Sequence, residues 1–318
     1  MQTLAITGAT GFLGRHLVSE CIFQGRFKLR LLMRDRNAFE HPSSDNITIC
    51  EGDLLKPETL KEFLQPEITL VHLAYMDNDR NANIEANFNL IKAVKQSGVK
   101  RLVHCSTAVV IGFHAKGVVS EETMPAPSGE YQLTKYRIEE MLRAELSPHV
   151  ELAILRPTEI IGPGGQGLRT LIERLRNESS YKNFIIHCIL KYRRFNYVSV
   201  HNVVAALILL ASSPIRQTSE IYNISDDDDA DNNYASVENI IASNLHLRQK
   251  HLFDIGLPLS ILSFLFKLRP NVAPPNRVYS HDKIILFGYR KVKTLQSAIS
   301  EIVSSEANYA RASYQISA

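Results

Sequence analysis

Short apolar runs alternate with segments of helical periodicity through the first half of the chain. The segments between the runs carry apolar residues three and four positions apart, and glycine, proline or polar residues separate the two kinds of pattern. This alternation is typical of βαβ units, whose right-handed crossovers place successive strands in one parallel sheet. The predicted strands are residues 3–7, 28–33, 48–51, 69–73, 101–105 and 152–155. The predicted helices are residues 11–24, 57–63, 82–97 and 129–146.

The pattern changes after Arg156. A glycine-rich loop at 162–167 comes first, followed by a helix and a strand-like stretch. Further on, the acidic run at 225–233 is predicted to be a solvated loop rather than a metal site, because adjacent aspartates in one loop lack a defined coordination pattern. The apolar stretch 255–266 is too short and too interrupted to span a membrane and is predicted to be a core helix; an interfacial membrane helix is the alternative.

Composition narrows the class of protein. With 318 residues, 45% hydrophobic and 22% charged, the chain is long enough for a globular α/β protein with a sizeable core. Its formal net charge of +3 is too small to indicate nucleic acid or a membrane as the main partner. Four cysteines without a CxxC pair indicate neither a zinc site nor a disulfide framework and favour a reducing cytoplasm. The first apolar run leads straight into a glycine turn, so no signal peptide is expected.

Residues 7–14 read TGATGFLG, directly after the first predicted strand and at the start of the first predicted helix. Gly8 allows a tight turn, Gly11 removes the side chain that would keep a pyrophosphate from the backbone, and Gly14 lets helix and strand pack closely. The helix N-terminus adds free N–H groups and the positive end of its dipole. This position between strand and helix predicts a dinucleotide-binding, Rossmann-like doubly wound sheet.

The glycine turn and the change of pattern together predict two regions. Residues 1–157 form the dinucleotide-binding domain, to which 195–215 returns. Residues 158–194 and 216–318 form a smaller C-terminal α/β substrate-binding region.

The end of the second strand favours NADP over NAD. An NAD enzyme usually carries a carboxylate there, which binds both ribose hydroxyls, whereas this chain has Met33 followed by Arg34. An arginine fork suits a 2′-phosphate. Asp35 keeps NAD open, because a shift of one residue at the strand end would place an acid near the ribose.

Several further motifs follow in a recognisable order. In them the chain resembles the extended short-chain dehydrogenase/reductases, the NAD(P)-dependent epimerase/dehydratase family, densely in its first half and thinly in its second. The motifs are TGATGFLG at 7–14, GDL at 52–54, HLAY at 72–75, the asparagines Asn83 and Asn89, GVKRLVHCST at 98–107, YQLTK at 131–135 and LRPTEIIGPG at 155–164.

The resemblance implies which residues contact the cofactor. It places Asp53 and Leu54 by the adenine, Ala74 by the pyrophosphate or ribose, and Pro157 near the nicotinamide. The implied cofactor-binding residues are Gly8, Thr10, Gly11, Phe12, Leu13, Gly14, Arg34, Asp53, Leu54, Leu73, Ala74, Tyr75, Cys105, Tyr131, Lys135 and Pro157.

Tyr131 and Lys135 stand four residues apart in the helical segment that follows the CST strand end at 105–107. Residues at this spacing share a helix face, so both side chains are predicted to point into one cleft beside the nicotinamide. An adjacent ammonium lowers the pKa of a phenol from about 10. Tyr131 is therefore predicted to exchange the proton while the nicotinamide exchanges a hydride, and Thr107 to hydrogen-bond the substrate oxygen.

The residues after Thr107 narrow the reaction. The resemblance implies an acid pair there in enzymes that eliminate water, and this chain has Ala108 and Val109. A ketoreductase and an epimerase remain, and Arg34 favours reduction. The prediction is an NADP-dependent oxidoreductase that transfers a hydride to or from a sugar carbon, most simply by reducing a keto nucleotide sugar.

The substrate is less defined than the reaction. By resemblance, Arg194 and Arg277 fall near positions that clamp a diphosphate, which suits arginine geometry. Glu159 and Phe195 depart from the residues that relatives often carry. Steroid-like or flavonoid-like ketones therefore stay open as substrates, and a non-catalytic NADP-sensing regulator and a structural interaction module remain as other functions.

Partners are expected to be few. The resemblance implies a homodimer that pairs the helix carrying Tyr131 with the helix of residues 83–97. No metal is predicted, because His72 and His104 lie in buried strands without a partner at ligand spacing. A small-molecule substrate is expected, in the first place a nucleotide sugar; nucleic acid is not expected, and a membrane contact is the less favoured alternative.

Overall fold

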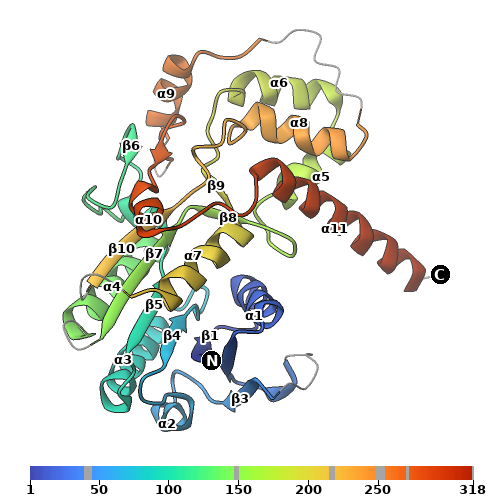
Figure 1. The fold of residues 1–318 in the computed structure, drawn as a ribbon. Helices are drawn as coiled ribbons and strands as arrows, with labels where there is room; N and C mark the ends of the chain where they lie inside the picture. Colours follow the sequence, from blue (N-terminus) through green and yellow to red (C-terminus); the bar gives the residue numbers. More distant parts are fainter. Residues whose placement is uncertain (39–44, 147–149, 215–218, 248–254, 270–271, 317–318) are drawn as a thin grey trace.

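A seven-stranded parallel sheet forms the centre of the molecule, in the order β10-β7-β5-β4-β1-β2-β3, with helices on both faces (Figure 1). This computed structural model describes the chain apart from residues 39–44, 147–149, 215–218, 248–254, 270–271 and 317–318. The doubly wound, Rossmann-like sheet predicted from the sequence is confirmed. The strands are β1 (Gln2–Thr7), β2 (Phe27–Met33), β3 (Ile47–Glu51), β4 (Thr69–His72), β5 (Arg101–Cys105), β7 (Glu151–Pro157) and β10 (Ser219–Ile224).

The strands read as continuous apolar runs because helices cover both faces of the sheet. In β1, for example, Leu4, Ala5 and Ile6 are all fully buried although successive side chains point to opposite faces. One core cluster joins the sheet to α1, α7 and α10, and a second joins its other face to α2, α3 and α4. These helices are α1 (Phe12–Gln24), α2 (Leu60–Phe63), α3 (Arg80–Ser97), α4 (Glu130–Leu146), α7 (Val200–Ser212) and α10 (Asp282–Phe287). Three 3₁₀ turns are η1 (Arg36–Ala38), η2 (Pro57–Thr59) and η3 (Ala108–Ile111).

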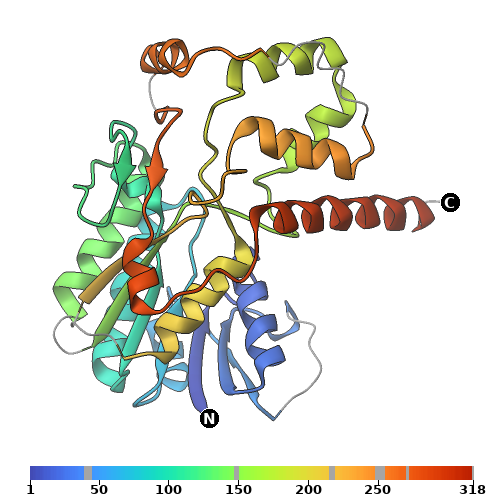
Figure 2. The ribbon, with the colours of Figure 1, turned by 45° about the horizontal axis from the view of Figure 1, so that its top comes forward.

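The remaining helices gather at one end of the sheet (Figures 1 and 2). The helices of residues 169–177, 234–244 and 295–316 contribute to a separate core that includes Ile172, Val237 and Ile299. The helices at this end are α5 (Arg169–Asn177), α6 (Ser180–Leu190), α8 (Tyr234–Asn244), α9 (Leu259–Lys267) and α11 (Leu295–Ile316). Two small parallel pairs join this part to the rest: β8 (Glu159–Ile161) with β9 (Tyr197–Ser199), and β6 (Val118–Val119) with β11 (Val278–Tyr279).

Two segments that the sequence assigns to the substrate-binding region lie on the central sheet instead. Residues 219–224, assigned from the sequence to the substrate-binding region, form β10 and pair with β7 as the edge strand of the central sheet. Helix α10 returns to the same sheet, where the Phe287 ring contacts Tyr222. The sequence pattern could not show this, because an edge strand far along the chain joins the sheet through pairing and not through local signals.

The acidic run 225–233 is not the solvated loop that the sequence predicts. Asp226 is fully buried and accepts hydrogen bonds from the Ser199 backbone N–H and the Asn202 amide. Asp227 is also buried and accepts a hydrogen bond from the Tyr279 backbone N–H. Because these carboxylates satisfy backbone donors of β9 and β11, the run ties the small strand pairs together.

The apolar stretch 255–266 does form a helix, α9, but it is not the core helix that the sequence predicts. Leu262 is its buried side chain, whereas Ile261, Phe264 and Leu265 are exposed. Among the described residues, no helix has the length and hydropathy needed to cross a membrane.

Candidate active site

The glycine turn closes on the carboxyl end of the sheet as the sequence predicts. Gly8 has φ +73°, and a Cβ there would lie 2.7 Å from the Ala74 backbone nitrogen. A Cβ on Gly14 would lie 2.0 Å from the Gly8 carbonyl oxygen, so the first turn of α1 fits against the loop only with glycine at that position. The turn thus brings backbone N–H groups at the start of α1 to the edge of a cavity, an arrangement that binds phosphate groups.

That cavity collects most of the residues predicted to bind a cofactor. Its walls come from the carboxyl ends of β1, β2 and β4 and from the start of α3. The predicted residues that line it are Gly8, Thr10, Gly11, Arg34, Asp53, Leu54, Leu73, Ala74 and Tyr75. Further lining residues that sequence reasoning did not assign to the cofactor are Thr7, Leu32, Met33, Gly52, Met76, Asn83, Ala86 and Asn87.

Three predicted cofactor residues of the first helix do not line the cavity. Gly14 is buried under the turn, and Leu13 packs against the core of the sheet. The Phe12 ring faces the glycine-rich loop instead, since a Cβ on Gly165 would lie 2.9 Å from its Cζ atom. These three residues shape the glycine turn, whereas the backbone of that turn faces the cavity.

Arg34 and Asp35 point to different places at the end of β2. Arg34 is exposed and lines the cavity. The Asp35 carboxylate accepts a hydrogen bond of 2.8 Å from the Asn37 backbone N–H and so caps the turn that follows. Met33 is buried in the wall. Arg34 is therefore the charged residue after β2 that lines the cavity, and its charge is positive.

Tyr131, Lys135 and Thr107 meet at the carboxyl end of β5. The Tyr131 hydroxyl hydrogen-bonds Thr107, and the two groups lie on α4 and at the start of η3. The Lys135 ammonium is buried and donates a hydrogen bond of 3.1 Å to the Cys105 carbonyl oxygen. The Tyr75 ring lies 4.6 Å from that ammonium and 5.3 Å from the Tyr131 ring. The predicted trio is therefore assembled next to Tyr75, which lines the cavity, whereas Tyr131, Lys135, Cys105 and Pro157 are not among its lining residues.

The pKa of Tyr131 moves in the opposite direction to the sequence prediction. Burial raises it to about 12, and the hydrogen bond with Thr107 opposes this only in part. The pKa of Lys135 is lowered, mainly because the ammonium is buried. Without a ligand, Tyr131 is thus a protonated phenol at neutral pH, which is the form that donates a proton.

A buried chain of hydrogen bonds supports the cavity from behind. The Thr7 hydroxyl lies 2.7 Å from His72 Nδ1, and His72 Nε2 lies 3.1 Å from the Asn87 side-chain oxygen. Burial and the nearby Lys135 lower the pKa of His72 to about 3, so the ring is neutral. His72 therefore acts as a packed, hydrogen-bonded residue, as predicted, and it fixes Asn87 on α3.

Asn83 holds the rim of the same cavity. Its side-chain oxygen accepts from the Met76 backbone N–H, and its amide donates to the Met76 and Asp79 carbonyls. Asn89, two residues beyond Asn87, donates to the Leu54 carbonyl. The sequence motif identified Asn83 and Asn89, but only the structure shows that their side chains hold the surrounding loops.

A second cavity lies beside Thr107 and opens toward the C-terminal region. It is lined by residues of η3, β8, the 193–196 segment and the 272–279 segment, and Phe113, Glu159, Arg193 and Phe195 are among them. Burial raises the pKa of Glu159, while the Arg193 charge opposes the shift. We call this space the substrate cavity.

The two arginines predicted to clamp a diphosphate differ in their placement. Arg194 lines the substrate cavity and donates to the Asp227 carbonyl at 3.0 Å. Arg277 is buried, and each of its guanidinium nitrogens donates to a backbone carbonyl of the 112–115 loop. Arg277 lines the substrate cavity as well, and its guanidinium holds the loop that forms part of the cavity wall. Within the described part of the chain, His, Cys, Asp and Glu side chains form no group that could hold a metal ion.

Known proteins of one family match most of the chain. The model of a family described as "NAD dependent epimerase/dehydratase family" matches residues 4–225, more than half of the chain. The N-acetyl-α-D-glucosaminyl-diphospho-ditrans,octacis-undecaprenol 4-epimerase of Escherichia coli O157:H7 is 25% identical over 268 residues, which cover 80% of this chain and 77% of that protein. Sterol demethylase protein B of Methylococcus capsulatus is 27% identical over 173 residues, 51% of this chain and 52% of that protein. The chain spans about half the length of this and two other curated relatives that it matches.

Among solved structures, the UDP-glucose 4-epimerase of Thermotoga maritima, determined with UDP-glucose, superimposes with a TM-score of 0.72. The two chains are 17% identical, and the match covers 97% of this chain and 100% of that one. At this identity the likeness shows a shared fold, which extends through the C-terminal region.

Proposed function

The chain belongs to the NAD dependent epimerase/dehydratase family, and from this premise we propose that it is an NADP(H)-dependent oxidoreductase that reduces a ketone, in the first place a keto nucleotide sugar. The observation that carries the proposal is the hydrogen-bonded pair of Tyr131 and Thr107. Tyr75, whose ring contacts Tyr131, lines the dinucleotide cavity, and Ala108, next to Thr107, lines the substrate cavity.

Each residue of the site has a distinct task. The hydroxyls of Thr107 and Tyr131 bind the carbonyl oxygen of the substrate, and Tyr131 donates its proton to that oxygen as it becomes an alcohol. Lys135, held by the Cys105 carbonyl, keeps a positive charge behind the phenol and stabilises the phenolate that remains. A bound dinucleotide supplies the hydride that reaches the carbonyl carbon. Tyr131 is protonated at neutral pH, which is the form that the reducing direction requires.

The preference for NADP rests on Arg34. Its guanidinium lines the dinucleotide cavity and has no ion pair in the described part of the chain, while the neighbouring Asp35 carboxylate is engaged with Asn37. A free arginine at this place suits a 2′-phosphate, whereas NAD would gain nothing from it.

The change Arg34→Ala is expected to raise the Kd of NADPH by about tenfold to a hundredfold, since a hydrogen bond to a charged group contributes roughly 1.5–3 kcal/mol. The Kd of NADH should change by less than about twofold. Isothermal calorimetry with both cofactors measures this. Arg36→Ala is the matched control, because Arg36 is also exposed but pairs with Glu51. Equal affinities for both cofactors that Arg34→Ala leaves unchanged would contradict the NADP assignment.

We place a nucleotide sugar first among the substrate classes for two reasons, the charge of Arg194 and the names of two similar proteins. Arg194 brings a cation to the substrate cavity, and two proteins that the chain resembles carry names with sugar diphosphates. A lipophilic ketone is the second class. It is favoured by Phe113, Phe195 and Val272 in the cavity wall and by the likeness to sterol demethylase protein B.

One assay distinguishes these classes. The protein is incubated with NADPH and a panel of keto nucleotide sugars and keto sterols, and the loss of absorbance and the stereochemistry of the product are followed. Oxidation of NADPH by a keto sugar supports the first class, and oxidation by a sterol supports the second. Inversion of a sugar hydroxyl without net NADPH loss would instead identify an epimerase, and cofactor binding without any hydride transfer would identify a sensor.

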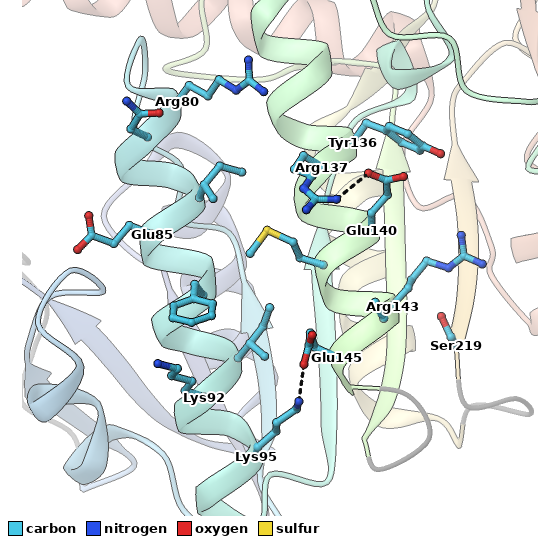
Figure 3. A pocket seen from close by; sticks show the side chains of 16 residues that line it. Arg80, Glu85, Lys92, Lys95, Tyr136, Arg137, Glu140, Arg143, Glu145 and Ser219 are labelled. Carbon is cyan, nitrogen blue, oxygen red and sulfur yellow. Dashed lines mark hydrogen bonds and ion pairs between the residues drawn. The ribbon is translucent and has the colours of Figure 1, made fainter.

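A homodimer through α3 and α4 is part of the proposal. A groove between these helices has an apolar floor that includes Ile84, Phe88 and Met141. Figure 3 shows charged side chains along both helices, with Lys95 of α3 paired to Glu145 of α4 at one end. An apolar groove with a charged rim on two parallel-lying helices suits a second copy of the same surface, which would form a four-helix contact.

Phe88→Asp is expected to convert a dimer at micromolar concentration into a monomer, because the carboxylate would be buried in the centre of the contact. Sedimentation velocity measures the change. Phe23→Asp serves as the control, since Phe23 is an exposed phenylalanine on α1, away from this groove. A monomeric native chain, or a dimer that Phe88→Asp leaves intact, would contradict the interface.

The site is proposed to work in a reducing cytoplasm, where the four free thiols are stable.

A further inference from the structure

Helix α9 presents apolar side chains to solvent. Phe264 is 60% exposed, and Ile261, Leu265 and Leu268 are exposed beside it. In this helix Leu262 is buried against the rest of the molecule. A surface helix normally turns such a stripe toward the core, so this face is available for something outside the chain.

Helix α6 extends the same kind of surface. Tyr181, Ile185 and Ile189 follow one another at intervals of four residues, so they share a helix face, and all three are exposed. The segment leading into α9 packs on the end of α6, because the Leu257 backbone N–H donates to the Cys188 carbonyl at 2.7 Å. Gly256 lies directly against the side chains of Lys191 and Tyr192. We call these exposed apolar residues of α6 and α9 the α6–α9 face.

The two segments that carry the α6–α9 face contain bases but no acids. Lys267 and Arg269 are exposed at the end of α9, whereas Arg193 and Arg194 line the substrate cavity. Residues 180–194 and 255–269 contain no aspartate or glutamate, although these acids make up 33 of the 318 residues of the chain. The bases in these two segments are Lys182, Lys191, Arg193, Arg194, Lys267 and Arg269. Of these, Lys182 pairs with Glu178 just before α6. Exposed apolar side chains with basic residues and no acids fit the surface of an anionic lipid bilayer, where rings enter the headgroup region and ammonium groups meet phosphates.

The inner side of α9 leads toward the active site. A cavity between α9 and the 113–117 loop is lined by Ser263, Phe266 and Lys267. It shares Phe113, Val272 and Pro274 with the substrate cavity. The Arg193 guanidinium lies 5.7 Å from the centres of the Phe266 and Phe195 rings, which connects α9 to the substrate cavity wall. Helix α9 thus separates the α6–α9 face from the space beside Thr107.

We propose that the α6–α9 face docks the protein on an anionic membrane surface, with α9 lying over the entrance to the substrate cavity. Docking of this kind requires no spanning helix and corresponds to the interfacial helix that the sequence left as the alternative for residues 255–266. One consequence rests on the proposed function: docking favours its second substrate class, a lipophilic ketone that reaches the site from the bilayer. The docking itself does not depend on the identity of the substrate.

Vesicle binding of the full chain tests the proposal. The native protein is expected to sediment with vesicles of phosphatidylcholine mixed with phosphatidylglycerol and much less with phosphatidylcholine alone. Phe264→Ser should lower the partition coefficient about tenfold, because the ring no longer enters the interface. Lys267→Gln and Arg269→Gln should each lower it about fivefold on anionic vesicles, corresponding to about 1 kcal/mol per basic residue, and high salt should have a similar effect.

Phe23→Ser is the matched control, since Phe23 is 86% exposed on α1 and lies outside this face. The control should bind vesicles like the native protein, and all variants should keep the native thermal unfolding midpoint and NADPH affinity. Absence of vesicle binding, equal binding to neutral and anionic vesicles, or native binding by Phe264→Ser would overturn the proposal. Self-association that Phe264→Ser abolishes would also overturn it and would assign the face to a second copy. Vesicle binding without ketone reduction would leave docking in place and contradict the proposed function alone.

Discussion

Replacing Tyr131 by phenylalanine is expected to lower turnover by about two to four orders of magnitude, the range that a positioned acid contributes. The phenol is the group that hydrogen-bonds Thr107 next to the residues of the two cavities, and it is protonated at neutral pH, so a proton is present for the substrate oxygen. The substitution removes one oxygen atom and leaves the ring in place. The thermal unfolding midpoint and the Kd of NADPH should therefore stay close to the native values, while single-turnover NADPH oxidation with a ketone identified from the panel becomes slow.

Tyr136→Phe provides the comparison for this experiment. Tyr136 lies on the same helix, α4, but lines the groove between α3 and α4 rather than the dinucleotide cavity. The Tyr136→Phe variant should retain native turnover. If Tyr131→Phe retained turnover as well, the proton would have to come from another group, and the roles of Thr107 and Lys135 would need to be assigned again.

The sequence was sufficient for features that depend on local geometry. The glycine turn could be predicted because Gly8 needs a positive φ and Gly14 has no room for a Cβ, and both requirements follow from one strand–turn–helix segment. Tyr131 and Lys135 could be paired because a four-residue spacing places them on one helix face. The alternation of apolar runs and helical segments was likewise enough to predict the parallel sheet.

Features that depend on distant contacts could not be predicted in this way. The pKa of Tyr131 was expected to fall, but burial raises it, and the Lys135 ammonium is engaged with the Cys105 carbonyl and the Tyr75 ring. Arg277 was assigned to the substrate, yet its guanidinium holds a loop more than 160 positions earlier in the chain, at Gly112. In both cases the side chain was recognised as important, and tertiary packing decided what it does.

The four adjacent aspartates show the same limit. A run of like charges is usually solvated. Here the fold supplies buried backbone N–H groups at Ser199 and Tyr279 that need acceptors, and two of the carboxylates meet them. A local pattern cannot reveal donors that come from other parts of the chain.

Arg156 and Glu139 form the contact whose loss should cost the fold most. Both side chains are 2% exposed, and the guanidinium donates to the two carboxylate oxygens at 3.0 and 2.5 Å. Glu139 stands one turn beyond Lys135 on α4, and Arg156 directly precedes Pro157 at the end of β7. The pair therefore fixes the helix that carries Tyr131 against the sheet next to the dinucleotide cavity.

Arg156→Met is expected to lower the free energy of unfolding by about 3–5 kcal/mol, because it leaves the Glu139 carboxylate buried without its cation. Denaturant unfolding measures this loss. The double variant Arg156→Met/Glu139→Leu should recover most of it, since neither charge is then buried. If the ion pair also positions α4, the double variant should unfold nearly like the native protein but reduce ketones more slowly, with a larger effect on kcat than on the Kd of NADPH. A small loss in the single variant would show that water or a rearranged side chain satisfies Glu139. Native turnover in the double variant would show that packing alone holds Tyr131 in place.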